Sequence, residues 1–332
     1  MPAVSVVSTV LNESDDIDGL VESVMRQTLA PAEVIIVDGG STDGTWERLE
    51  GARTRYPTLV PIRDESCSLQ RSAGPIARGR NVAISAASSG VIACADAGCI
   101  YDPDWLANLT APIFTGESEY SVGGSYVRPT NADRPSSNQS KSTVWDVASA
   151  PFFGVKLNPD AATKSCTARS MAFRKELWRR VGGFPETFFL GEDTLFDAKA
   201  RKLVTPAFAK RAKACYQPRH TLGSALRQMA NYSAAYGVLG GRPARLWRNL
   251  ARCLAEILAA LALIYSPIPL LSVLALEIYF AFRLDWTDLR KAPMRTLGAR
   301  LIFSSIVPWV AAWSQIAGSI TKKNRPNRQN FS

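Results

Sequence analysis

Carboxylates follow three apolar runs of the chain, and their residue types suit the binding of a nucleotide. The runs and the acids after them are Val4–Val10 with Glu13, Val34–Val37 with Asp38, and Val91–Ala95 with Asp96. Short β-branched runs bounded by turn residues are typical of buried parallel strands. Ligands of open α/β sheets bind just beyond the carboxyl ends of such strands. A carboxylate there can accept hydrogen bonds from a nucleotide base or a ribose.

From the residues alone, each acid can also have a purely structural role instead of binding a ligand. Asp38 can simply close a turn, and Asp43 can cap the next helix. Glu192 and Asp193 form a further acidic pair, which on its own is typical of a helix amino terminus, where the helix dipole favours negative charge. A lone His220 is more often structural than a ligand.

Helical segments separate the apolar runs. Ile17, Leu20, Val21 and Val24 have helical spacing between the first two runs, and Val82–Ile84 precedes the third. Alternating strands and helices predict an α/β fold with a mostly parallel sheet flanked by helices. Such a sheet would bring the three strand ends to one edge.

Three segments together resemble a known family. SVVSTVLNE, LVESVMRQT and VIIVDGGSTDGT are similar to the amino-terminal signature of family 2 glycosyltransferases, which have the GT-A fold. The resemblance continues to about residue 240. It implies inverting transfer of a sugar from a nucleotide-sugar donor, with Glu13 and Asp38 at the nucleoside.

The resemblance also implies a divalent metal and a donor diphosphate site. Asp96 occupies the place of the family's Asp-x-Asp motif, which binds Mg²⁺ or Mn²⁺, but Gly98 replaces the second Asp. His220 is the leading candidate to complete the metal site. Arg80 matches an Arg-Asn pair near the donor, and Arg219 and Arg227 are expected phosphate partners.

The Gly-Glu-Asp sequence that ends at Asp193 resembles the family's acceptor-side signature. The resemblance assigns Asp193 the role of general base, which takes the proton of the attacking hydroxyl. Glu192 would orient the acceptor or the base. Pro185 stands where the family usually has Asp, while Glu186 is retained. The polar stretch 128–143 predicts a surface loop on the acceptor side.

The amino-acid composition limits the metals and macromolecules that the chain is expected to bind. One His and six scattered cysteines give no zinc-ligand spacing and no obvious disulfide framework. No cleaved signal peptide is apparent in residues 1–30. The net charge is +10, and Lys199 to Arg252 contains twelve Lys/Arg and no Asp or Glu. This basic block leads into apolar segments and lacks a nucleic-acid-binding motif, which favours a membrane over nucleic acid as partner.

The apolar segments are Cys253–Phe282, interrupted by two prolines, and Ala299–Ile320. Each half of the first is short for a bilayer core, which needs ~20 apolar residues in a helix. A helical hairpin, a re-entrant loop, an interfacial pair, full crossings and a buried core helix pair all stay open. The predicted domains are a GT-A domain over 1–240, a membrane-associated helical region over 241–320 and a basic tail over 321–332.

These features predict a glycosyltransferase at the inner or plasma membrane, with its catalytic domain facing the cytoplasm. The expected acceptor is a lipid-linked sugar or a growing surface glycan. Two alternatives stay open. A sugar-nucleotide-forming nucleotidyltransferase would need a Gly-rich basic loop near the start, and none is found. A non-catalytic membrane scaffold is favoured by Gly98 and disfavoured by the intact Glu192-Asp193 pair.

Overall fold

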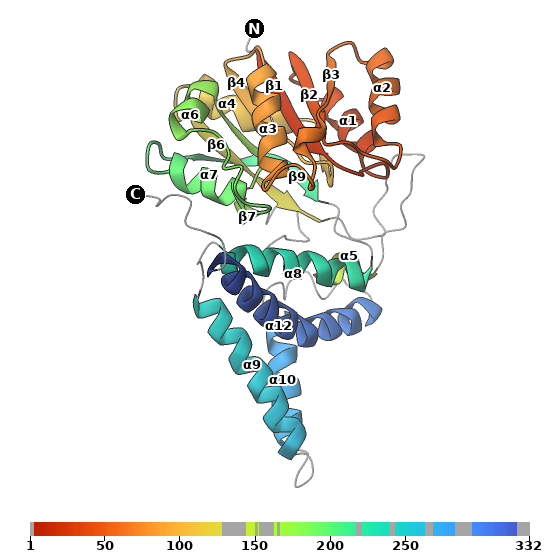
Figure 1. Cartoon of the computed structure of the whole chain (residues 1–332), viewed down its shortest axis with the longest axis vertical. Coiled ribbons are helices and arrows are strands. Elements are labelled where there is room, and N and C mark those ends of the chain that lie inside the picture. Colours follow the sequence, from red (N-terminus) through yellow and green to blue (C-terminus); the bar gives the residue numbers. More distant parts are fainter. Residues whose placement is uncertain are drawn as a thin grey trace. The chain divides into compact units, whose positions relative to one another are not determined.

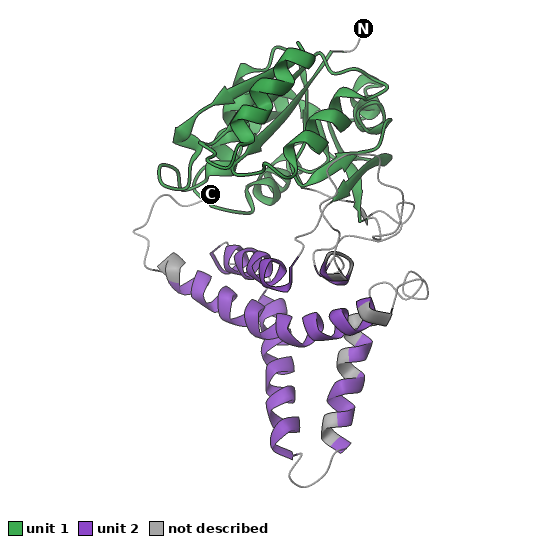
Figure 2. Cartoon of the chain, turned by 90° about the vertical axis from the view of Figure 1, so that its right-hand side faces the viewer, with its two compact units in different colours: residues 1–140, 155–217 green, residues 141–154, 218–332 purple. Residues whose placement is uncertain are grey.

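The computed structural model describes residues 3–127, 144–149, 152, 163–164, 167–216, 221–238, 243–262, 268–282 and 294–323. The predicted loop 128–143 lies outside these residues. Internal contacts divide the chain into two compact units (Figure 2): unit 1 comprises residues 1–140 and 155–217, and unit 2 comprises 141–154 and 218–332. This division groups residues 218–240 with the second unit, whereas the sequence-based boundary groups them with the first.

Unit 1 is built on a mixed sheet (Figure 1). Its described strands follow the order β3-β2-β1-β4-β8-β6-β9-β5, and β7 pairs with β6. β3, β2, β1 and β4 are parallel, and β8 joins β4 in antiparallel fashion. The predicted α/β class is confirmed. The strand bounds are β1 Val4–Val10, β2 Glu33–Asp38, β3 Leu59–Arg63, β4 Val91–Cys94, β5 Cys99–Tyr101, β6 Tyr120–Tyr126, β7 Thr163–Lys164, β8 Met171–Arg174 and β9 Ala207–Tyr216.

The register of the parallel strands sets the positions of two predicted site residues. Val10 of β1 pairs with Asp38 of β2, and Val7 pairs with Cys94 of β4. The carboxyl ends of β2, β1 and β4 therefore reach the same edge of the sheet. Asp38 ends β2 and Asp96 follows β4, so the two lie on this edge two strand spacings apart, about 10 Å.

Helices α3, α6 and α7 share one apolar core with the sheet. Phe196 of α7 stacks on Phe184, with ring centroids 4.4 Å apart, and also contacts Phe173 of β8 at 5.0 Å. These rings fix α7 against the sheet one turn beyond Glu192. The helices of unit 1 are α1 Ile17–Met25, α2 Thr45–Arg55, α3 Pro75–Ala86, α4 Trp105–Phe114, α6 Lys175–Val181, α7 Glu192–Ala200 and the short 3₁₀ turn η1 Glu65–Cys67.

The described part of unit 2 is helical. Its helices are α5 Val144–Ser149, α8 Leu222–Val238, α9 Pro243–Ala262, α10 Ile268–Phe282 and α12 Met294–Lys323. α8 packs against α12 around a small core that includes Ala225, Met229, Phe303 and Val307. α9 and α10 contact each other and α12. The apolar segments predicted from sequence therefore form helices, and Pro308 lies inside α12.

Among the described residues, one helical segment has the length and composition to cross a bilayer. It is Thr296–Ile320 of α12, and 44% of its most apolar stretch is buried inside the protein. A helix in the core of a soluble protein meets the same criterion. Length and composition therefore give only weak support for a membrane span here.

Candidate active site

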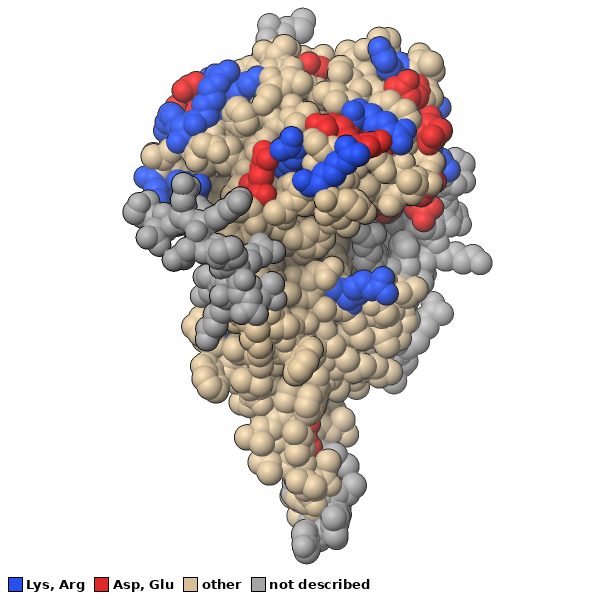
Figure 3. All heavy atoms as spheres, viewed as in Figure 1, with Lys and Arg blue, Asp and Glu red and all other residues tan. Residues whose placement is uncertain are grey.

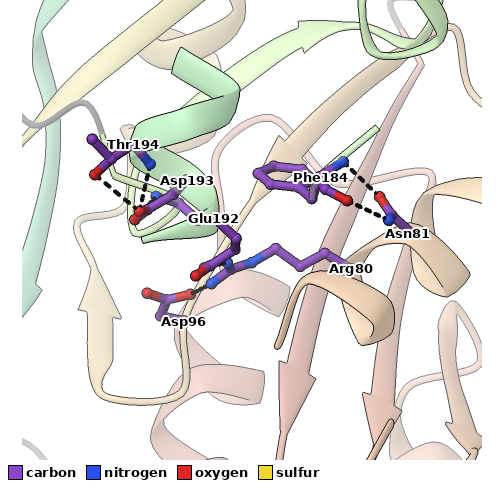
Figure 4. A network of polar contacts seen from close by, with 8 residues as sticks. Arg80, Asn81, Asp96, Phe184, Glu192, Asp193 and Thr194 are labelled. Carbon is purple, nitrogen blue, oxygen red and sulfur yellow. Dashed lines mark hydrogen bonds and ion pairs between the residues drawn. The ribbon is translucent and has the colours of Figure 1, made fainter. Parts of the chain in front are cut away.

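A buried arginine joins carboxylates from two distant segments (Figure 4). Arg80 of α3 is 4% exposed, and its Nη2 donates to Oδ1 of Asp96 at 2.7 Å. Its Nη1 forms an ion pair with Oε1 of Glu192, which is also buried. The end of β4 and the start of α7 thus meet at one guanidinium.

Local sequence explains how these groups reach one another. Gly79 lets α3 approach β1, because a Cβ at this position would overlap the Thr9 side chain. Arg80, the next residue, is thereby held beneath the carboxyl edge of the sheet. Gly191 has a φ of 90°, which suits glycine, and it turns the chain so that Glu192 begins α7.

Burial and neighbouring charges perturb the ionisation of this cluster. Burial, followed by the charge of Asp193, raises the pKa of Glu192 to about 7, although Arg80 acts in the opposite direction. Burial alone would lower the pKa of Arg80, but Asp96 and Glu192 together raise it above its ordinary value. Arg80 is therefore a permanent cation among three carboxylates. Perturbed groups of this kind are enriched at functional sites.

Asp193 lies beside the cluster and is half-buried. Its Oδ1 accepts a hydrogen bond from the backbone N–H of Thr194 at 2.6 Å. Its Oδ2 accepts one from the N–H of Ala168 at 3.3 Å. These bonds orient the carboxylate in the first turn of α7.

The loops after β1 and β2 are tied together at the predicted nucleoside end. The N–H of Asn12 donates to Ser41 Oγ, and the N–H of Glu13 donates to Thr45 Oγ1. Asp43 accepts from the N–H groups of Ser14 and Thr45. Partial burial opposes the shift, but the hydrogen bonds from Thr45 and Ser14 lower the pKa of Asp43 to about 2.

Asp38 is fully buried behind these loops. Its Oδ1 accepts from the N–H groups of Gly40 and Ser41 at 2.6 and 2.7 Å. Its Oδ2 has no hydrogen-bond partner among the described residues. A buried carboxylate oxygen without a donor is unfavourable, so it marks a place where a ligand N–H or O–H would be stabilising.

Asn81 secures the loop that leads to α7, a role that the sequence does not reveal. Its Nδ2 donates to Phe184 O and Glu186 Oε1, both at 2.8 Å. Its Oδ1 accepts from the Phe184 N–H at 2.9 Å and from Trp178 Nε1 at 3.1 Å. All the hydrogen-bonding groups of this amide are engaged, so α3 and the Gly182–Gly191 loop are held as one piece.

The predicted site residues fall into three groups. Asp96, Arg80, Glu192 and Asp193 come together in unit 1, and Asp38 and Glu13 lie further along the same sheet edge. Arg227 is on α8 of unit 2, where it is exposed. Arg219 and His220 lie outside the described residues. The roles assigned to all these residues stay predictions.

The residues at the carboxyl edge of the sheet supply only some of the ligands that a divalent metal ion needs. No group of three possible ligands occurs among the described residues. Asp96 has one oxygen on Arg80, and its side chain is 31% exposed, so its carboxylate still reaches solvent. A single carboxylate suits Mg²⁺ or Mn²⁺ when water and phosphate oxygens supply the other ligands.

The sequence matches glycosyl transferase family 2 over residues 5–182, more than half of the chain. The chain therefore belongs to this family, as the sequence resemblance predicts. It is 32% identical over 127 residues to glycosyltransferase AglE of Haloferax volcanii, covering 37% of this chain and 39% of AglE. It is 27% identical over 205 residues to the succinoglycan biosynthesis protein ExoA of Rhizobium meliloti, covering 59% of this chain and 57% of ExoA.

A solved structure supports the fold. The mannosyltransferase PcManGT from Pyrobaculum calidifontis, in complex with GDP-Man and Mn²⁺, aligns with a TM-score of 0.58 and 20% identity. The alignment covers 92% of this chain and 86% of PcManGT. The predicted GT-A fold is therefore confirmed. The chain spans about two fifths of AglE and under three fifths of ExoA, so these matches concern only part of each relative.

Proposed function

We propose that the chain transfers a sugar, with inversion, from a nucleotide-sugar donor to a lipid-linked or surface-glycan acceptor. The observation that carries this proposal is the cluster at the sheet edge, where Asp193, in the first turn of α7, lies beside the Arg80–Asp96 ion pair. It combines an oriented carboxylate for proton transfer with a second carboxylate for the donor side. Family membership supports the same reaction class.

In the proposed reaction, the acceptor hydroxyl attacks the anomeric carbon as Asp193 takes its proton. The bond from that carbon to the diphosphate oxygen breaks, and its electron pair leaves with the nucleoside diphosphate. Attack opposite to the leaving group inverts the anomeric centre in a single displacement. The transition state has oxocarbenium character, as in glycoside hydrolysis.

The donor would lie along the sheet edge from Asp38 to Asp96. The buried Oδ2 of Asp38 is available to accept a hydrogen bond from the nucleoside. The separation of about 10 Å between these residues suits an extended nucleoside diphosphate. Glu13, Arg219 and Arg227 are further donor contacts in this proposal.

Asp96, with His220, would hold Mg²⁺ or Mn²⁺ against the diphosphate. The metal would stabilise the charge that develops on the leaving group. The PcManGT complex supports a divalent metal in the proposed site, since it contains GDP-Man and Mn²⁺ on the same fold. Arg80 would keep Asp96 in place.

The acceptor and the location are proposed from the second unit and from ExoA, a protein of succinoglycan biosynthesis. The apolar helices of unit 2 and the basic segment before them suit a membrane at which the catalytic domain faces the cytoplasm. Nucleic acid is not an expected partner.

Substituting Asp193→Asn tests the base assignment. Transfer should fall by about 10² to 10⁴, because the variant cannot take the proton, while donor binding is retained. Asp18→Asn is a matched control, since Asp18 pairs with Arg48 on the surface. Full transfer activity in Asp193→Asn would refute the assignment. Donor hydrolysis with and without Mn²⁺ distinguishes the transferase from a nucleotidyltransferase and from an inactive scaffold.

A further inference from the structure

Unit 2 exposes large apolar side chains along two neighbouring helices. α9 and α10 contact each other and form a hairpin (Figures 1 and 2). Exposed apolar surface gathered in this way marks an interaction site. The exposed residues are Leu254, Ile257, Leu258 and Leu261 on α9, and Ile268, Leu271, Leu274, Ile278 and Tyr279 on α10.

Positive charge is confined to one end of α9. Arg245, Arg248 and Arg252 lie in its first ten residues, and the rest of the helix carries only Glu256. The carboxylate of Glu256 accepts a hydrogen bond from Trp309 Nε1 of α12, so it lies where α9 meets α12. Figure 3 shows Lys, Arg, Asp and Glu gathered on unit 1 and few of them on the described part of the hairpin.

Aromatic side chains mark the base of the hairpin. Trp247 of α9 is 69% exposed, and Trp309 and Trp313 of α12 are 43% and 75% exposed. α12 meets α9 at this level, because Arg252 Nη2 donates to the backbone oxygen of Ser304 at 3.0 Å. Exposed Trp beside Arg is typical of the membrane–water interface, where the ring is half-immersed and the cation contacts anionic head groups.

We propose that the α9–α10 hairpin inserts into one leaflet of an anionic bilayer, with α12 lying along the membrane surface. The part of α9 after Arg252, Cys253–Ala262, carries Glu256 as its one charged residue and is about 15 Å long, and α10, with Glu277 as its one charged residue, is about 22 Å long. A hydrocarbon core is about 30 Å thick, so the hairpin reaches roughly its middle. Because the two helices form a hairpin, the chain enters and leaves on the same side.

The packing of α12 argues against a bilayer crossing by Thr296–Ile320, the segment of α12 that has the length and composition of a membrane span. A Cβ at Gly237 of α8 would overlap the backbone of Gln315, so the two helices are in close contact there. Ala225 and Met229 share a core with Phe303 and Val307, which shows that α8 and α12 run in the same direction.

Gly237 of α8 lies beside Gln315 of α12, and the two helices run in the same direction. Arg227, which is exposed and ten residues before Gly237, therefore lies at the level of Ser305, ten residues before Gln315. This is close to the middle of the Thr296–Ile320 segment. A crossing by α12 would therefore bring Arg227 and the exposed Asn231 to the centre of the bilayer, which is unfavourable. At the surface both side chains keep their water.

Vesicle flotation of the full chain tests the inference. The protein should float with vesicles of phosphatidylcholine and phosphatidylglycerol, and less with phosphatidylcholine alone. The double variant Leu258→Glu with Leu261→Glu should lower binding at least about tenfold, because it places charge in the inserted region. Leu69→Glu with Leu203→Glu is the matched control in unit 1, where the two side chains are 52% and 50% exposed.

Equal flotation of the hairpin variant and its control would overturn the proposal, as would equal binding to both vesicle types. Circular dichroism checks that both variants fold. The inference deepens the membrane association proposed above but uses only the surface of unit 2. Nucleotide-sugar binding is measured separately, so failure of one proposal does not imply failure of the other.

Depth-dependent quenching tests the single-leaflet arrangement. A fluorophore on Leu261→Cys should be quenched best by nitroxides deep in the acyl chains. The same fluorophore on Ile302→Cys of α12 should be quenched best by nitroxides near the head groups. The native cysteines that the structure describes are buried. Labelling of the parent chain, which has neither introduced cysteine, measures the background. Deep quenching at both positions would show that α12 crosses and would overturn the arrangement.

Discussion

The guanidinium of Arg80 lies 2.7 Å from the Asp96 carboxylate, and this ion pair joins helix α3 to the loop after β4. The other terminal nitrogen pairs with Glu192. Both terminal nitrogens are therefore engaged by carboxylates. The sequence resemblance predicts Arg80 near the donor diphosphate. The geometry points instead to an indirect effect of Arg80 on the donor, in which Arg80 holds the Asp96 carboxylate in position.

Arg80→Ala should be strongly destabilising. Above pH 7, where Glu192 is ionised, the substitution removes the cation from a buried cluster and leaves the Glu192 charge without compensation, which costs about 3–5 kcal/mol of unfolding free energy. Urea denaturation measures this loss. Arg71→Ala is the matched control, because Arg71 pairs with Glu65 at the surface and should contribute about 1 kcal/mol or less. Equal losses in the two variants would contradict the structural role of Arg80.

The raised pKa of Glu192 predicts a specific pH dependence of stability. The folded state holds this proton up to about pH 7, while the unfolded chain releases it near 4.5. The unfolding free energy contributed by this group therefore falls as the pH rises from about 4.5 to about 7. Glu192→Gln has no such proton to release.

The unfolding free energy of the parent chain minus that of Glu192→Gln should accordingly decrease as the pH rises through that window. The slope should not exceed about 1.4 kcal/mol per pH unit. Urea denaturation of both proteins across the window measures it, and the titrating groups that do not interact with Glu192 cancel in the difference. A difference that stays constant with pH would show that Glu192 keeps its ordinary pKa.

The strands and their terminal acids are predictable from sequence because both signals are local. Val34–Val37 followed by Asp38 has the composition of a buried strand and a turn, and β2 ends at Asp38. Asp96 follows β4 in the same way. Because β2, β1 and β4 are parallel within the mixed sheet, these acids share an edge.

The partners of Arg80 are not predictable, because they depend on tertiary packing. A helical Arg between Gly79 and Asn81 has the composition of an exposed position. Arg80 is nevertheless buried, and the neighbouring Gly79 shows how closely α3 approaches Thr9 of β1. Three hydrogen bonds of Asn81 likewise involve a loop about a hundred residues further along the chain, and the fourth comes from Trp178 of α6. The grouping of α8 with unit 2 follows from its contacts with α12, which no local pattern encodes.

Asp38→Asn should weaken donor binding while leaving the fold intact. Asn keeps an oxygen for the N–H groups of Gly40 and Ser41, but it replaces the acceptor Oδ2 with a donor. Loss of one hydrogen bond to a charged group is worth about 1.5–3 kcal/mol, or roughly tenfold or more in affinity. Thermal shifts with UDP-, GDP- and dTDP-sugars measure the effect. Unchanged shifts would remove Asp38 from the donor site.

Asp43→Asn should destabilise the loops after β1 and β2 at neutral pH. The folded-state pKa of Asp43, about 2, is below its ordinary value of 3.8. Its contribution is therefore present above pH 3.8 and is lost as the pH falls toward 2. The group is largely exposed, so the effect is screened and small. Melting temperatures of parent and variant should converge at low pH, and a gap that persists there would contradict the prediction.

Asn81→Asp should loosen the loop that carries the acceptor-side carboxylates. The introduced carboxylate retains the acceptor that receives Phe184 N–H and Trp178 Nε1, but it cannot donate to Phe184 O and places a negative charge against Glu186. Each lost bond is worth about 1 kcal/mol, and the like charges add to the loss. In the proposed enzyme the KM for the acceptor should rise more than the KM for the donor, because the loop leads into Asp193.

Steady-state kinetics with each substrate varied in turn measures this difference. Ser85→Ala is the control on the same helix, because its hydroxyl donates only to the Asn81 carbonyl within α3 and should leave both KM values unchanged. Repulsion between the introduced carboxylate and Glu186 also makes a specific rescue testable. Adding Glu186→Gln removes one of the two facing charges and supplies an amide donor, so it should restore part of the acceptor affinity. Equal increases in both KM values, or no rescue in the double variant, would show that the loop does not couple α3 to the acceptor side.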